Sequence, residues 1–309
     1  MNGAVLRSAL PGLALVVLWS SGFIGAELGT REAPTSTLLA WRYLVASLIL
    51  VALCVGLHER ATWDGIRRQA VLGVLGQALY LGLTVGGVAL GATAGTSSLI
   101  ASLQPLLVVA LAAVALAERV RPAQLLGLGL GLAGVLLVVG GDLAGGGVGW
   151  WVYLLPLAGM SALALGTVLQ QRWQPPESLL MSLTIQTVAA AAVFWVFALA
   201  DGSTAAPMTT GFWAAIAWVV LLSSFGGYGA YLYVSRTQGA TRASTWLYLT
   251  PPTTMLWAAW MFGDRVTPLG LAGLLVSAVG VAVALRARSA ASPGARCRRT
   301  RRRSRTSGS

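Results

Sequence analysis

The 309-residue chain contains no lysine, a single histidine and only two cysteines, and 10% of its residues are charged. Soluble domains usually have about 25% charged residues; here 56% of residues are hydrophobic and the mean hydropathy is +0.76. The absence of lysine excludes a Walker A loop, the Gly-rich phosphate-binding loop that needs a lysine to contact the phosphates. Cys54 and Cys297 are a poor disulfide pair, and together with His58 they give no metal-ligand spacing. The composition predicts a membrane protein without a metal site.

All 21 basic residues are arginines, and nine of them fall in the last 24 residues. A basic surface on a folded domain would suggest nucleic acid, but a basic tail directly after an apolar helix favours the anionic cytoplasmic leaflet of a membrane. We therefore expect a lipid-bilayer partner and no nucleic-acid partner. Residues 287–309 are predicted to form a disordered, Arg-rich cytoplasmic tail.

Apolar segments of about 20 residues, the length of a transmembrane helix, divide the chain at charged or Gly/Pro-rich breaks. We expect an all-α integral membrane protein with ten transmembrane helices, at 11–29, 36–57, 70–90, 96–117, 122–140, 150–170, 179–200, 211–234, 241–262 and 267–286. The first segment has only Arg7 before it and no convincing cleavage site, so we interpret it as a retained helix rather than a signal peptide.

The distribution of arginines predicts the orientation of these helices. If the N-terminus lies in the cytoplasm, nine of the arginines that precede the tail fall in cytoplasmic segments. Only Arg31 and Arg265 then fall in loops on the opposite side of the membrane. This asymmetry follows the positive-inside rule and needs an even number of spans. We expect a multi-pass protein of the cell inner membrane with both termini in the cytoplasm.

The chain repeats itself at an offset of 146 residues, without a gap from Thr96 to Leu137. At this offset Pro105 matches Pro251, and "LAERVRP" at 116–122 matches "FGDRVTP" at 262–268. Five helices per copy force the second copy to enter the membrane from the opposite side, which makes two inverted five-helix repeats. The predicted units are a first repeat at 1–141 and a second at 150–286.

Several stretches resemble the EamA-type transporters of the drug/metabolite transporter superfamily. They are "LVVLWSSGFIGAELG" with "PTSTLLAWRYLVASLIL", then "TSSLIASLQPLLVVALAAVALAERVRP", and "ASTWLYLTPPTTMLWAAWMFGDRVTP" in the second half. The resemblance covers residues 11–286, with Asp264 where the family usually has glutamate. It implies a ten-helix transporter of small organic metabolites or drugs, often an exporter, without an organic cofactor.

Polar and aromatic residues inside the apolar segments are the candidates for a substrate cavity, because polar groups that face hydrocarbon are costly. The predicted cavity residues are Trp19, Phe23, Arg42, Gln77, Tyr80, Ser102, Gln104, Gln186, Tyr228 and Tyr248. Gln77, Tyr80 and Thr84 are spaced to lie on one stripe of a helix. Each of Pro105 and Pro251 is expected to kink its helix beside the cavity.

Some of these residues have two interpretations. Arg42 either contacts an anionic substrate group or Glu27, or extends its guanidinium to the outer interface. For Gln186 an interhelical hydrogen bond is the favoured alternative, and for Glu27 an ion pair with Arg31. We interpret the motif residues Pro105, Glu118, Arg119, Pro251, Asp264 and Arg265 as structural. Pro122 and Pro268 should each begin a helix, the second capped by Thr267.

The residues favour transport over catalysis, since no span carries paired carboxylates and no histidine or cysteine cluster exists. We expect a secondary transporter, with export of amino acids or drugs by alternating access, and with the helices at 122–140 and 267–286 as scaffold or homodimer surface. The alternatives are a membrane-embedded enzyme or lipid scramblase, and a signalling or assembly protein without a substrate path.

Overall fold

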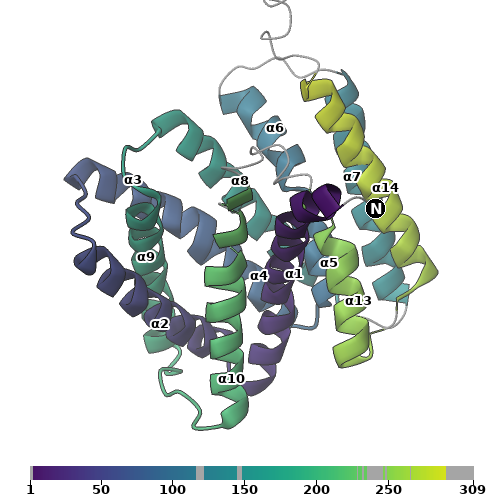
Figure 1. Cartoon of the computed structure of the whole chain (residues 1–309). Coiled ribbons are helices and arrows are strands. Elements are labelled where there is room, and N and C mark those ends of the chain that lie inside the picture. Colours follow the sequence, from purple (N-terminus) through teal and green to yellow (C-terminus); the bar gives the residue numbers. More distant parts are fainter. Residues whose placement is uncertain are drawn as a thin grey trace, which may run out of the picture.

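The computed structural model describes residues 3–115, 122–144, 148–227, 229–231, 233–234, 246–247, 249–264 and 266–289. Throughout these ranges the secondary structure is helical and includes no strand (Figure 1). The helices are α1 Gly3–Glu32, α2 Thr35–Gly56, α3 Trp63–Gly73, η1 Val74–Leu79, α4 Tyr80–Ala89, α5 Ala94–Ala101, α6 Gln104–Ala115, α7 Pro122–Ala144, η2 Trp150–Tyr153, α8 Leu154–Trp173, α9 Leu179–Ala200, α10 Thr210–Trp218, η3 Val219–Gly227, α13 Thr250–Phe262 and α14 Pro268–Ser289.

Six helical segments in the described ranges are long and apolar enough to cross a membrane. They are Leu10–Glu32, Thr35–Gly56, Trp63–Ala89, Trp150–Gln170, Leu179–Ala200 and Thr210–Tyr231. Shorter apolar helices cover Ala94–Val108, Leu125–Gly141 and Pro268–Gly280. All nine fall on segments predicted from hydropathy, which confirms the all-helical, multi-pass membrane class.

Hydroxyl side chains cap the N-terminal ends of several helices. They accept hydrogen bonds from the first backbone N–H groups, which have no partner within the helix. Thr267 Oγ1 accepts a hydrogen bond from the Gly270 N–H at 3.0 Å, and α14 begins at Pro268. α7 likewise begins at Pro122. The predicted cap and both predicted helix starts are confirmed.

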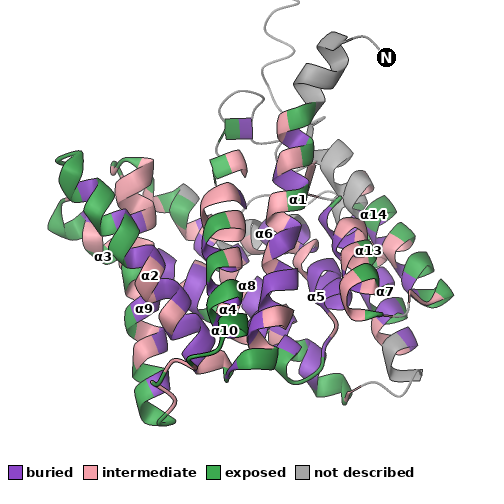
Figure 2. Ribbon diagram, turned by 60° about the horizontal axis from the view of Figure 1, so that its bottom comes forward, coloured by how far each residue is buried: buried purple, intermediate pink, exposed green. Residues whose placement is uncertain are grey.

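The helices pack mainly in pairs distant in sequence: α7 with α14, α2 with α9, and α5 with α13. α7 and α14 lie together at one end of the molecule, and α2, α3 and α9 at the other (Figure 1). α1 runs between them and contacts η3 and α13. Buried residues gather in the middle, and exposed ones line the outer faces (Figure 2).

Glycines bring α7 and α14 very close. The Ser277 hydroxyl donates to the Gly131 carbonyl at 3.1 Å, and a Cβ at Gly134 would overlap both Ser277 and the Gly273 carbonyl. A Cβ at Gly280 would lie 2.6 Å from the Gly131 nitrogen. This contact, here called the α7–α14 seam, is of the small-residue type that joins membrane helices.

Three helices are irregular where they cross the middle of the molecule. η1 joins α3 to α4 as a π-helical turn, and η3 continues α10 in the same way. The predicted helix at 96–117 is broken between α5 and α6, at Ser102 and Leu103. π-turns and breaks are common at functional sites in membrane helices.

Candidate substrate cavity

Three neighbouring pockets share lining residues and form one candidate cavity. The first, the Arg42 pocket, has about 450 Å³ of empty volume and is lined by Arg42, Tyr43, Ala46, Leu50, Gln77, Leu183, Thr187, Ser224 and Phe225. The central pocket, of about 510 Å³, shares Arg42 and adds Trp19, Gly22, Phe23, Ala26, Tyr80, Leu81, Thr84, Val85 and Ser223. The Ser102 pocket, of about 500 Å³, shares Trp19, Phe23 and Tyr80 and adds Ser98, Ala101, Ser102, Gln104, Met160, Leu163, Leu247 and Thr250.

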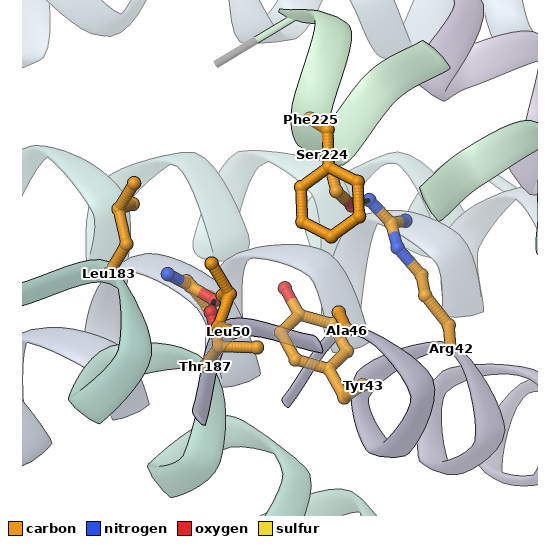
Figure 3. Close-up of a pocket in the computed structure, with 9 residues that line it drawn as sticks. Arg42, Tyr43, Ala46, Leu50, Leu183, Thr187, Ser224 and Phe225 are labelled. Carbon is orange, nitrogen blue, oxygen red and sulfur yellow. Dashed lines mark hydrogen bonds between the residues drawn. The ribbon is translucent and has the colours of Figure 1, made fainter. Parts of the chain in front are cut away.

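Arg42 is 5% exposed and lies two turns into α2. One of its terminal nitrogens donates to Ser224 Oγ at 3.3 Å, and Figure 3 shows the guanidinium pointing from α2 to that serine. Its Nε makes no hydrogen bond to any described residue, and none of the described ion pairs includes it. A guanidinium remains charged in a protein, so Arg42 is a buried charge held by neutral partners.

Glu27 is not the partner of Arg42. Its Oε1 accepts from Arg31 at 2.7 Å, one helical turn further along α1, and the Arg31 guanidinium also lies 4.4 Å from the centre of the Phe262 ring. The predicted Glu27–Arg31 pair is confirmed. The alternative in which Glu27 neutralises Arg42 is wrong.

A chain of amide hydrogen bonds joins α3 and η1 to α9 beside the Arg42 pocket. Gln186 Nε2 donates to Gln69 Oε1 at 2.7 Å, and Gln77 Nε2 donates to Gln186 Oε1 at 3.4 Å. Thr187 Oγ1 in turn donates to Gln77 Oε1 at 3.4 Å. Gln186 therefore makes the interhelical hydrogen bond favoured from sequence, and it does not line any of the three pockets.

Three aromatic side chains line the central pocket. Trp19 and Phe23 are one turn apart on α1 and face Tyr80, the first residue of α4. The Trp19 ring also lies against Tyr231, with 5.8 Å between ring centres. Thr84 Oγ1 is buried here without a hydrogen bond to the described protein. This part of the cavity suits an apolar or aromatic body.

The broken helix supplies the polar side of the Ser102 pocket. Ser98 and Ser102 each donate to a carbonyl three residues back, at 2.7 and 2.6 Å. Gln104 begins α6, and Thr250 begins α13 with a buried hydroxyl that bonds to no described residue. The ends of two half-helices thus meet at one pocket.

Seven of the predicted cavity residues line these pockets: Trp19, Phe23, Arg42, Gln77, Tyr80, Ser102 and Gln104. Tyr228 and Tyr248 are outside the described residues, as are Glu118, Arg119, Arg265 and most of the Arg-rich tail. Their roles remain predictions.

Of the other motif residues, Asp264 directly follows Gly263, the left-handed cap of α13. Pro105 is the second residue of α6, and Pro251 and Pro252 fall in the first turn of α13. The prolines therefore begin half-helices, where their missing N–H costs little, and do not kink continuous ones.

Several polar lining residues were not expected from sequence, among them Thr187, Ser223 and Thr250. Two of them could have been found, because at the 146-residue offset Ser223 matches Gln77 and Thr250 matches Gln104. Thr187 carries no such signal. Among the described residues, no group of three or more histidine, cysteine or acidic side chains could hold a metal ion.

The model of the EamA-like transporter family matches the chain twice, at residues 6–140 and 150–286. The "Uncharacterized inner membrane transporter YedA" of Escherichia coli is 25% identical over 260 residues, which cover 83% of each chain. The "Probable terminal-alkyne amino-acid exporter" of Streptantibioticus cattleyicolor is 28% identical over 301 residues, covering 94% of this chain and 99% of that one.

A third relative, the "Probable amino-acid metabolite efflux pump" of Salmonella typhimurium, is 24% identical over 278 residues, covering 87% of this chain and 91% of that one. One solved crystal structure of a protein 22% identical in sequence superposes with a TM-score of 0.63, covering 93% of this chain and 99% of that one. That likeness supports the fold alone.

Proposed function

The chain belongs to the EamA-like transporter family, and from that premise we propose that it is a secondary transporter that exports small organic metabolites, such as amino acids or drugs, across the inner membrane by alternating access. Two relatives carry names that describe an exporter and an efflux pump, and a third is named an inner membrane transporter. Membership of this family indicates that the chain is a multi-pass membrane transporter.

The observation that carries the proposal is the cavity around Arg42. A buried charge with only neutral described partners is costly and is usually functional within a membrane. Here it lines two neighbouring pockets, opposite Ser224 and beside Trp19 and Tyr80 of the central pocket. The residues come from both halves of the chain, as expected for a transporter site between repeats.

Helix packing supports two inverted repeats of five helices, ten spans in all. In this arrangement α2 corresponds to α9 and α7 to α14, and each of these two pairs of corresponding helices packs together, while α13, which corresponds to α6, packs on α5. α1 and α8 occupy equivalent positions in the two halves, and each packs against the irregular helix of the other half. α1 packs on η3, and α8 packs on η1 and α4. The proposed units are 1–141 and 150–286, followed by the tail at 287–309.

The irregular turns also correspond. At the 146-residue offset η1 matches residues 220–225, inside η3, and the start of α6 at Gln104 matches the start of α13 at Thr250. Discontinuous helices in equivalent positions of the two halves are the feature that marks transporter binding sites. We propose that these turns let one half rock against the other.

Orientation and assembly complete the proposal. The arginine distribution supports a cytoplasmic location for both termini, where the basic tail would be attracted to anionic lipid headgroups. The outer faces of α7 and α14, which expose Leu136 and Leu275, are scaffold or homodimer surface. A membrane-embedded enzyme or scramblase would need a reactive cluster at an interface; among the described residues, no group of three or more histidine, cysteine or acidic side chains could hold a metal ion there.

Flux in proteoliposomes tests the proposal. The purified protein should move at least one member of a panel of amino acids, a sugar, a cationic drug and an organic monocarboxylate, relative to protein-free vesicles. Arg42→Gln should lower that flux while expression stays normal, and Arg67→Gln, which removes an exposed charge from α3, is the matched control. No flux for any compound would refute the transporter function, and equal flux in both variants would exclude Arg42 from the site.

A further inference from the structure

The cavity has an unbalanced charge. Among the described residues that line the three pockets, Arg42 is the only one with a formal charge, and none of them carries a carboxyl group. The nearest acidic residue along α1, Glu27, is paired with Arg31 and lines none of the pockets. The described cavity wall therefore presents one positive charge and no negative one.

The partners of Arg42 leave part of its hydrogen-bonding capacity unused. A guanidinium has five N–H donors arranged to grip a carboxylate with two of them. Here one nitrogen bonds to Ser224 Oγ, the Tyr43 ring lies 5.7 Å from the guanidinium carbon, and Nε, buried from solvent, has no described acceptor. Serine and tyrosine do not cancel the charge.

We propose that this cavity selects substrates with a net negative charge: organic monoanions whose carboxylate pairs with Arg42 and whose apolar or aromatic body lies against Trp19, Phe23 and Tyr80. This inference rests on the proposed transport function and adds the charge class of the substrate. It differs from the amino acids that the names of two relatives describe.

Charge balance decides between the substrate classes. A monoanion neutralises Arg42, so the occupied cavity has no net charge. A zwitterion brings its own ammonium group, and no described lining residue supplies an acceptor of opposite charge for it. A cation places a second positive charge beside the guanidinium. Preference should therefore fall in the order anion, zwitterion, cation.

Three compounds with the same phenyl body separate these cases: phenylpyruvate is an anion, phenylalanine a zwitterion and phenethylamine a cation at neutral pH. Flux of each is measured in proteoliposomes with the full chain, after subtraction of flux in protein-free vesicles. Binding is measured separately, from the rise in unfolding temperature of the detergent-solubilised protein, since a ligand that binds the folded state stabilises it.

We expect flux and binding of phenylpyruvate to exceed those of phenylalanine by roughly tenfold, because both carboxylates can pair with Arg42 but the ammonium group of phenylalanine has no described acceptor of opposite charge. Arg42→Lys should keep the preference for the anion, Arg42→Gln should abolish it, and Arg67→Gln should leave it unchanged. A structural role of Arg42 alone would lower all three fluxes together without changing their ratio.

The outcomes separate the two claims. Equal or better flux of phenylalanine or phenethylamine refutes the anion preference and leaves transport intact. Preferential binding of phenylpyruvate without flux of any probe keeps the anion site and refutes transport. Neither binding nor flux of any of the three overturns the proposed site.

Discussion

Alanine in place of Gly134 should destabilise the protein, because the α7–α14 seam leaves no room for a methyl group there. A Cβ at Gly134 would lie 2.5 Å from the Gly273 carbonyl oxygen and 2.6 Å from the Ser277 nitrogen. Both are backbone atoms and cannot move as a side chain can. Ordinary contact needs about 3.5 Å, so the two helices must separate by about 1 Å.

The cost follows from the contacts that this separation weakens. A radial gap of 0.5–1 Å forfeits about a quarter to a half of each van der Waals contact. For roughly 40 atom pairs at about 0.15 kcal/mol each, the loss is about 1.5–3 kcal/mol. Alanine is also a better helix former than glycine by about 1 kcal/mol, which offsets part of this loss.

Gly129→Ala is the matched control, since it makes the same change in the same helix at a position with nothing within 4 Å. The propensity gain is common to both variants, so their difference in unfolding free energy isolates the overlap. We expect Gly134→Ala to be less stable than Gly129→Ala by about 1.5–3 kcal/mol, measured by unfolding in mixed micelles. Equal stability of the two variants would refute the packing argument.

Three further variants test other parts of the structure. Gln69→Leu should cost about 1–3 kcal/mol, because the fully buried Gln69 side chain donates to Ser182 and accepts from Gln186, and the substitution leaves both without this partner; an unchanged unfolding midpoint would contradict this. Thr254→Val should be nearly neutral, since the Thr254 hydroxyl has no described hydrogen-bond partner, whereas Thr184→Val should be the more destabilising because Thr184 donates to Leu180. Gly22→Val should block flux with normal expression, because its side chain would enter the central pocket against Ser223, while Gly86→Val, at an open position, should not; equal flux in the two would argue against this route.

The positions of the helices could be predicted from sequence because hydropathy and break residues determine them. The segment expected at 179–200 is α9, Leu179–Ala200, and that expected at 36–57 is α2, Thr35–Gly56. α3 begins at Trp63, seven residues before the expected span. The prediction missed these first turns because they are polar and include the Arg68–Asp64 ion pair. A hydropathy pattern does not detect such an extension.

The π-turns could not be predicted, and they change which residues share a pocket. Gln77, Tyr80 and Thr84 were expected on one stripe of a regular helix. In the structure Gln77 lies in η1 and lines the Arg42 pocket, whereas Tyr80 and Thr84 line the central pocket. A π-turn holds an extra residue, and this rotates the residues after it about the helix axis. That change depends on tertiary packing and leaves no simple pattern in the sequence.

The contact between Gly131 and Ser277 joins two positions that are 146 residues apart, the repeat offset itself. If the halves are related by two-fold pseudosymmetry, this is where the axis passes, and each residue there meets its own counterpart. Two identical serines would have to share the space that one hydroxyl fills. Linking both halves in one gene product removes that constraint, because each copy can mutate alone. One half can then keep a hydrogen-bond donor on the axis while the other provides the cleft that receives it.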